Sequence, residues 1–262
     1  AFSSCEVETK FETEAPLIPE MVFVKGGIIE GADYPWAPPK GNFPKGRLVQ
    51  LSDFAIGKYE VTQEEYYSVM KDEVVSVTAY VDGVGERTAE FFMDSRPSFC
   101  KPNNPPYHCF EGENQERRPV EGITFYDALW YCNVLSRKTD LEPVYKIKVT
   151  EVTSVNFSSH ITNAEVEMIP GANGYRLPTA CEAEYAMRGG DPNAPDWDYL
   201  FSGAVSEPGR ERYSINKGLD PVGWYQYNNK TGVSGTSDSD RENNTYYSYQ
   251  GTHEVGLKKP NR

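Results

Sequence analysis

The sequence predicts an α+β fold that is rich in loops. Its 262 residues suffice for one large domain or two small ones with a substantial core. Hydrophobic residues make up 38% of the chain, below the usual share, whereas Gly (22), Pro (19) and Tyr (18) are abundant. This composition disfavours a helical bundle. Three short helical patterns that alternate with β-rich stretches complete the argument for α+β.

The β-rich stretches open the folded part of the chain and recur between the helical patterns. Residues 46–62 alternate apolar and polar side chains, as a half-buried strand pair would. Residues 74–92 show β-branched alternation around the turn signal Asp82-Gly83 and predict a hairpin. The other β-rich stretches are residues 21–31, which end in glycine, and residues 142–155 and 161–171, which predict a second hairpin.

Three helices are predicted from capping boxes. In this motif a threonine and an acidic residue three positions later each bond the other's backbone N–H group. The pairs that fit are Thr62–Glu65, Thr124–Asp127 and Thr179–Glu182. Gly189 is placed to end the third helix, and residues 175–178 before it predict the end of a short strand.

The helical patterns also predict core residues, which are Tyr66, Val69 and Met70 in the first helix and Ala128, Leu129, Cys132 and Leu135 in the second. Arg176, Glu182 and Glu184 allow a catalytic interpretation. A structural one is favoured, because Glu182 belongs to a capping box and Arg176 is placed to pair with a carboxylate. Arg188 suits the dipole at the end of its helix.

Charge and histidine content exclude several classes of function. The formal net charge of −13 disfavours nucleic acid as a partner, because neutralising phosphates requires clustered Lys and Arg. No segment approaches the roughly 20 apolar residues that cross a membrane. The three histidines, His108, His160 and His253, are expected in loops without partners at metal-ligand spacing. No metal site and no His-based catalytic site is expected.

The five cysteines include no CxxC pair and no zinc spacing. Cys132 and Cys181 fall in helical patterns and are expected to be small buried hydrophobic residues. Cys100 and Cys109 lie in one Pro/Asn-rich stretch and are candidates for a local disulfide in an oxidising compartment. Spacing alone leaves both the bonded and the unbonded state open.

The first residues, "AFSSC", resemble the lipid-attachment site of bacterial lipoproteins in its looser spirochaetal form. On this interpretation Cys5 carries the acyl chains, and residues 1–20 form a polar, acidic tether. The alternative is a chance cysteine near the terminus. The expectation is an exported protein at the cell surface or outer membrane, which contacts the membrane only through this anchor.

Aromatic residues near the C-terminus are the most suggestive functional feature. They lie among Asn, Ser, Thr and Gly, a mixture typical of binding loops, because Tyr provides contact area with little loss of conformational entropy. The candidate ligand-binding residues are Trp224, Tyr225, Tyr227, Tyr246, Tyr247 and Tyr249. Burial in the core is the alternative for both groups. The expected partner is an unidentified protein or glycan at the cell surface, and the chain is expected to be a monomer.

Five blocks together resemble the formylglycine-generating (sulfatase-modifying factor) family. In chain order they are "MVFVKGG", "FAIGKYEVTQEEYYSVM", "RPVEGITFYDALWYCNVLS", "NGYRLPTACEAEYAMRGG" and "PVGWYQYN…THEVGLKKPN". The resemblance implies a C-type-lectin-like fold over residues 21–262, with a modest mixed sheet, packed helices and much irregular structure. In detail it is closest to spirochaetal surface lipoproteins of the treponemal variable-protein type, which display a variable ligand-binding face.

The resemblance leaves two functions open. The family's enzymes hold copper on a cysteine pair in a C-terminal block that has no counterpart here, and none of the five cysteines matches it. A truncated C-terminus is therefore considered, and no cofactor is expected. The favoured function is a surface-anchored binding module. The alternative is a formylglycine-generating oxidase whose catalytic cysteines lie beyond Arg262. Fold analogy alone does not decide between them.

Overall fold

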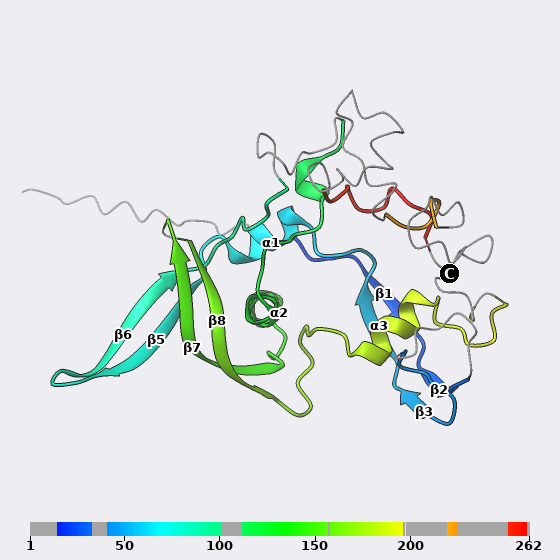
Figure 1. Ribbon diagram of the computed structural model, residues 1–262, viewed down its shortest axis with the longest axis horizontal. Helices are drawn as coiled ribbons and strands as arrows, with labels where there is room; N and C mark the ends of the chain where they lie inside the picture. Colours follow the sequence, from blue (N-terminus) through cyan, green and yellow to red (C-terminus); the bar gives the residue numbers. More distant parts are fainter. Residues whose placement is uncertain are drawn as a thin grey trace, which may run out of the picture.

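Four pairs of strands and three helices form the described part of the molecule (Figure 1). The computed structural model describes residues 15–32, 41–100, 112–156, 158–195, 197, 219–224 and 251–260. In chain order the elements are β1 (Met21–Val24), β2 (Gly27–Glu30), β3 (Leu48–Leu51), β4 (Phe54–Gly57), α1 (Gln63–Met70), β5 (Val74–Val81), β6 (Gly85–Phe92), the 3-10 turn η1 (Gln115–Arg117), α2 (Phe125–Lys138), β7 (Tyr145–Val155), β8 (Ser158–Met168) and α3 (Ala180–Met187).

The sheets confirm the α+β class but differ in detail from the expected mixed sheet. Among the described residues the strands form four two-stranded antiparallel sheets. The stretch 46–62 does contain two strands, yet these do not pair with each other: β3 pairs with β2 and β4 with β1. The inner pair, β2 with β3, lies between the strands of the outer pair, β1 with β4, in the chain. The two pairs together form a bent, two-stranded antiparallel ribbon.

The bend in this ribbon depends on Gly26. A Cβ atom there would lie 2.3 Å from the carbonyl oxygen of Leu51, so any other residue would clash with backbone. The Gly26 N–H donates to Oδ1 of Asp53 at 2.8 Å, which satisfies a backbone group that has left the ladder. The alternating pattern of residues 46–62 indicates two strands but does not indicate their partners, because these partners lie about 20–35 residues earlier in the chain.

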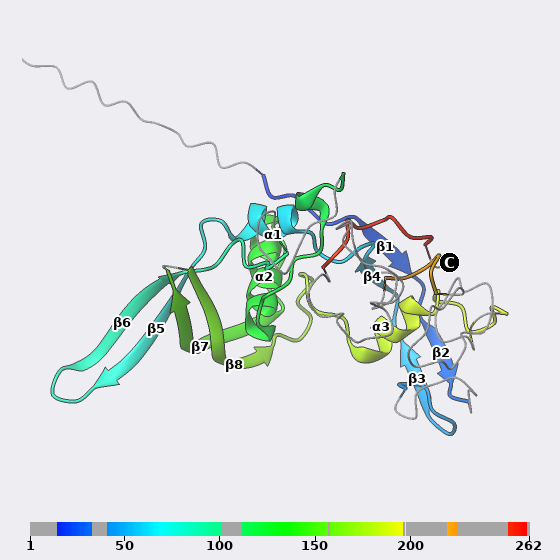
Figure 2. The same cartoon turned by 45° about the horizontal axis from the view of Figure 1, so that its top comes forward.

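Both predicted hairpins are present. β5 pairs with β6 around Asp82–Val84, and Gly83 has the positive φ of 75° that the turn signal indicated. β7 pairs with β8 over their whole length, with a register shift at Glu151. In Figures 1 and 2 the β5–β6 hairpin projects away from the body beyond the β7–β8 hairpin.

All three helices begin where the capping boxes predicted. The backbone N–H groups of the three capping threonines donate to the acidic side chains at 2.8 Å (Thr62 to Glu65), 3.0 Å (Thr124 to Asp127) and 2.8 Å (Thr179 to Glu182). Gly189, with φ of 89°, follows the last helix as expected. Capping is local chemistry, so sequence alone suffices to predict it.

The stretch 175–178 is not a strand, contrary to expectation. The Tyr175 N–H donates to the Ser136 hydroxyl at 2.8 Å, and the Leu177 N–H donates to the Tyr145 hydroxyl at 3.0 Å. Side-chain hydroxyls therefore accept the backbone N–H groups that a neighbouring strand would otherwise bind, and Pro178 has no N–H to donate.

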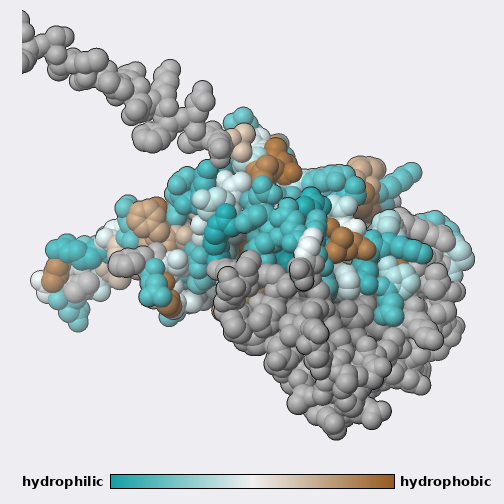
Figure 3. Space-filling model, turned by 90° about the horizontal axis from the view of Figure 1, so that it is seen from above, coloured by the Kyte–Doolittle hydropathy of each residue, from teal (hydrophilic) through white to brown (hydrophobic). Residues whose placement is uncertain are grey.

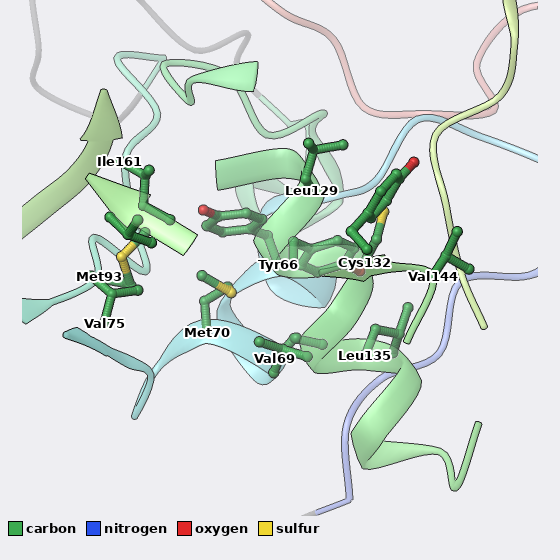
Figure 4. Packing of buried hydrophobic residues seen from close by; sticks show 14 residues of the cluster. Tyr66, Val69, Met70, Val75, Met93, Leu129, Cys132, Leu135, Val144 and Ile161 are labelled. Atoms are coloured by element: carbon green, nitrogen blue, oxygen red, sulfur yellow. The ribbon is translucent and has the colours of Figure 1, made fainter. Parts of the chain in front are cut away.

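The larger core lies between α1, α2 and the two hairpins (Figure 4). Tyr66 of α1 stacks on Tyr131 of α2 with ring centroids 5.3 Å apart. The buried hydrophobic residues of this core are Tyr66, Val69, Met70, Val75, Met93, Leu129, Tyr131, Cys132, Val134, Leu135, Val144, Tyr145, Val149 and Ile161. A smaller core joins β2 and β3 to α3 through Ile29, Phe43, Val49, Tyr185 and Trp197. The predicted helix faces are thus confirmed, apart from Ala128, which is only partly buried.

A charged cluster joins α2 to both hairpins through His160. This histidine lies on β8, so its expected place in a loop is wrong. Its Nδ1 lies 2.7 Å from Oδ2 of the fully buried Asp127, and its Nε2 lies 3.7 Å from Oδ2 of Asp94. Hydrogen bonds to Asp127 and then Asp94 raise the pKa of His160 to about 9, against the effect of burial. Asp127, which caps α2, therefore also fixes β8.

Candidate functional site

Trp224 is the one candidate binding aromatic that falls among the described residues. Its partners in that prediction, Tyr225, Tyr227, Tyr246, Tyr247 and Tyr249, lie outside them, as do Cys5 and Cys109. The binding and lipidation roles of these residues therefore remain predictions.

Trp224 is held between two side chains from the C-terminal stretch. The ring of His253 stacks on it with centroids 3.5 Å apart and planes 11° apart. Nζ of Lys258 lies 3.6 Å from the Trp224 centroid, a cation–π contact, and donates to the Asp220 carbonyl at 2.6 Å. Trp224 is nevertheless 40% exposed. It therefore combines a structural role with an exposed part.

His253 also belongs to a charged group centred on Glu113, which is partly buried. One carboxylate oxygen lies 2.7 Å from His253 Nδ1, and the other accepts from the Glu254 N–H at 3.0 Å and pairs with Arg118 at 3.0 Å. Arg118 is fully buried. Burial lowers the pKa of His253, although Glu113 opposes this shift.

Hydrogen bonds fix the C-terminal flank of residues 225–250 to the body and join the N-terminal flank to it. On the C-terminal flank, the Val255 N–H donates to the Arg117 carbonyl at 3.0 Å, and the Arg118 side chain donates to the Thr252 carbonyl. The two flanks are joined to each other by a bond from the Lys259 N–H to the Pro221 carbonyl, at 2.9 Å. In Figure 1 the red C-terminal flank runs from beside the green turn η1 to the orange N-terminal flank. We call Trp224, His253, Lys258, Glu113 and Arg118 the loop base.

Sequence reasoning identified one member of the loop base and missed four. His253 and Lys258 stand in the block "THEVGLKKPN", where a histidine near lysines gave no metal or catalytic pattern. Glu113 and Arg118 stand in "EGENQERR", which reads as a solvated charged stretch. Only the fold brings this stretch to the C-terminal one.

Charged residues around α3 have structural roles, as expected. Arg176 forms two hydrogen bonds to Glu182, at 2.7 and 2.8 Å, and this pairing lowers the pKa of Glu182 to about 2. Glu184 pairs with Arg188 at 2.9 Å and accepts the Asn42 N–H at 2.7 Å. Every carboxylate of the proposed catalytic constellation is thus engaged in holding α3 in place.

The described cysteines differ in environment. Cys132 is buried as predicted, and desolvation raises the pKa of its thiol to about 12. Cys181 is only partly buried, with Arg47 3.8 Å from its sulfur. Cys100 is buried, and its sulfur accepts the Thr252 N–H at 3.2 Å. Cys100 thus lies beside the loop base.

Two absences are established for the described part of the chain alone. No helix in it is long and apolar enough to cross a membrane. The same residues contain no group of three or more His, Cys, Asp or Glu side chains arranged to hold a metal ion.

Short sheets, capped helices and irregular segments around two cores define a C-type-lectin-like fold of the formylglycine-generating-enzyme type. Residues 7–262 match the Sulfatase-modifying factor enzyme 1-like domain, and the chain belongs to this family.

One curated relative and two solved structures are similar to the chain. It is 32% identical over 205 residues to "Chaperone protein LppX" of Paenibacillus barcinonensis, an alignment that covers 78% of this chain and 56% of that protein. The structure named "Treponema denticola variable protein 1" matches with 25% identity and a TM-score of 0.50, over 93% of this chain and 71% of that one. The structure named CarF has the same fold, with 20% identity and a TM-score of 0.52 over 93% of this chain and 74% of that one. The chain thus spans just over half the length of its curated relative.

Proposed function

We propose that this protein is a surface-anchored binding module that presents residues 225–250 to a protein or glycan ligand. The observation that carries the proposal is the loop base. It holds the two flanks of this segment together on a rigid body through the Trp224 stack and the partly buried Glu113 group. Binding residues are commonly placed on loops that a rigid scaffold positions in this way.

The composition of residues 225–250 supports the same role. The segment contains five tyrosines among Asn, Ser, Thr, Gly and Gln, and Val233 is its sole aliphatic residue. A segment with so little aliphatic content has few means of forming a core of its own. Its tyrosines are instead suited to contacting a partner. The similarity to a protein named a variable protein is in keeping with this proposal.

We further propose that Cys5 carries the lipid anchor and that its tether, expected over residues 1–20, ends before Leu17, whose N–H donates to the Ser68 hydroxyl at 2.9 Å. The motif "FSSC" followed by an acidic stretch supports this assignment. Mass spectrometry of the N-terminus from the native host tests it directly. A diacylated or triacylated Cys5 agrees with the proposal, and an unmodified Cys5 contradicts it.

The binding role is tested by replacing residues 226–249 with a Gly/Ser linker of equal length, which leaves the loop base intact. Wild type and variant are compared on arrays of glycans and of extracellular proteins. We expect wild-type binding that the variant loses, with little change in thermal stability. A matched control replaces the exposed turn Asp82–Val84 with Asn-Gly, because it alters another projecting loop and should leave binding unchanged. Binding that survives the linker replacement contradicts the proposal.

A further inference from the structure

A groove of about 330 Å³ lies beside the loop base, at the start of α1. Its size is at the lower end of pockets that hold small ligands, so it has room for a few side chains. Four stretches of chain line it: residues 17–20, the segment from Tyr59 to Glu65, Arg117 and Val255. In Figure 3 hydrophobic residues lie near the start of the described chain, on a face that is otherwise largely hydrophilic.

The groove has apolar walls that are open to solvent. Leu17, Ile18 and Tyr59 line it and are 44%, 55% and 36% exposed, respectively. Buried Val255 lies beside them, fixed by its bond to the Arg117 carbonyl. Exposed apolar side chains that gather in a concave site are uncommon on a protein of such low mean hydropathy (−0.62).

The polar lining of the groove is strongly acidic. Among the described residues it contains four carboxylates, Glu20, Glu60, Glu64 and Glu65, and one cation, Arg117. Arg117 is paired with Glu254 at 2.9 Å, so its charge is already compensated.

Two of the four carboxylates already have partners. Glu65 bonds the N–H and hydroxyl of Thr62 within its capping box, and Glu20 pairs with Lys58 at 2.8 Å. The side chains of Glu60 and Glu64 form no hydrogen bond or ion pair with any other residue that the structure describes. The groove therefore presents two uncompensated negative charges beside apolar walls.

We infer that this groove binds a basic segment of a partner protein, with a Lys or Arg side chain directed at Glu60 and Glu64 and a neighbouring apolar side chain against Ile18 and Tyr59. The carboxylates alone would indicate only a solvated surface on a chain of net charge −13. Their position around exposed apolar walls in one concave site is what specifies a mixed basic and apolar ligand.

The groove residues on which this inference rests all lie outside the segment 225–250. Arg117 and Val255 nevertheless connect the groove to the loop base, because Glu254, the partner of Arg117, also donates its N–H to Glu113. A partner held by the segment 225–250 would thus find the groove close by. The Gly/Ser replacement of residues 226–249 leaves every described groove residue unchanged, so the two proposals can be tested separately.

Three fluorescein-labelled nonapeptides test the inference by fluorescence polarisation at about 0.15 M salt, where distant charges are screened. They alternate Leu with Lys, Ser with Lys, or Leu with Glu. We expect the Leu/Lys peptide to bind more tightly than the other two. The double variant Glu60→Gln/Glu64→Gln should weaken its binding by about fivefold, and Ile18→Ser should weaken it as well.

The matched control is Glu165→Gln/Glu167→Gln, which removes the same charge from two exposed positions on β8. It should leave the Leu/Lys affinity unchanged. Equal weakening by both double variants overturns the inference, since general attraction to an acidic surface would then explain binding. Equal affinity for the Ser/Lys peptide, or the absence of saturable Leu/Lys binding, overturns it too. All substituted residues are exposed, so thermal denaturation should show folded variants.

Discussion

Trp224 and His253 stack face to face, with ring centroids 3.5 Å apart, although they flank opposite ends of the segment 225–250. The contact closes this segment at its base. Since His253 is also bonded to Glu113, and Glu113 to the buried Arg118, the stack is continuous with the interior of the protein.

Replacing Trp224 with Ala should loosen the flanks more than the whole fold. The substitution removes a half-exposed aromatic contact and a cation–π contact, which together stabilise the folded state by about 1–2 kcal/mol. We expect faster limited proteolysis within residues 225–250 and a modest fall in the urea midpoint. Tyr80→Ala is the matched control, because Tyr80 is 72% exposed on the projecting hairpin. Equal proteolysis of wild type and Trp224→Ala would contradict the role of the stack.

Replacing Tyr247 and Tyr249 with Ala should weaken ligand binding strongly and leave thermal stability nearly unchanged. In an extended run these two residues share a face, and aromatic hot spots typically contribute about 2 kcal/mol or more to binding. Calorimetric titration with a ligand found on the arrays, combined with a melting curve, provides the measurement. A collapse of the melting temperature with unchanged affinity per folded molecule would show that these tyrosines belong to the core.

The His160 cluster should make stability decrease at alkaline pH. Its folded-state pKa of about 9 lies above the unfolded value of about 6.5. The stabilisation is thus fully present below pH 6.5 and is lost as the pH rises through 9. His160 keeps some contact with solvent, so we expect a loss of about 1–2 kcal/mol rather than the full value of the shift. Urea unfolding of wild type and His160→Gln at pH 6 and pH 9.5 measures this. The free energy of unfolding of the variant should not show this fall between pH 6 and pH 9.5. An equal fall in both proteins would rule out His160 as its source.

The chain should not oxidise a cysteine to formylglycine. Thiolates attack and bind metals, and burial keeps the Cys132 thiol protonated by raising its pKa to about 12. Incubation with copper(I), oxygen and a Cys-x-Pro-x-Arg peptide, followed by mass spectrometry, should show unchanged peptide. The measurement is repeated with Cys132→Ala and Cys181→Ala. Turnover in the wild type that either substitution abolishes would favour the oxidase.

Features that depend on a few neighbouring residues were predictable from the sequence. The three capping boxes and the turn at Gly83 are of this kind, since donor, acceptor and backbone conformation lie within four residues of each other. The nested pairing of β1 with β4 was not predictable, because it depends on a bend that only Gly26 permits. Likewise, Asp127 was recognisable as a cap, but its second role as the partner of His160 arises only in the folded chain.

The candidate site divides in the same way. The aromatic residues of the site were predictable from the composition of the sequence around Trp224. The contacts of the loop base were not predictable, because Glu113 and His253 become neighbours only through folding. A charged residue in a hydrophilic stretch carries no local sign that it will be enclosed by distant segments.

The closed base has a consequence for how this protein can evolve. A segment whose ends are already joined adds little entropic cost when it grows, since each doubling of its length costs only about 0.6 kcal/mol. Substitutions and insertions between residues 225 and 250 therefore leave the residues of the loop base itself unchanged. Mutation can sample many sequences there while the rest of the chain stays under ordinary constraint, which is the physical requirement for rapid diversification at one place on a stable protein.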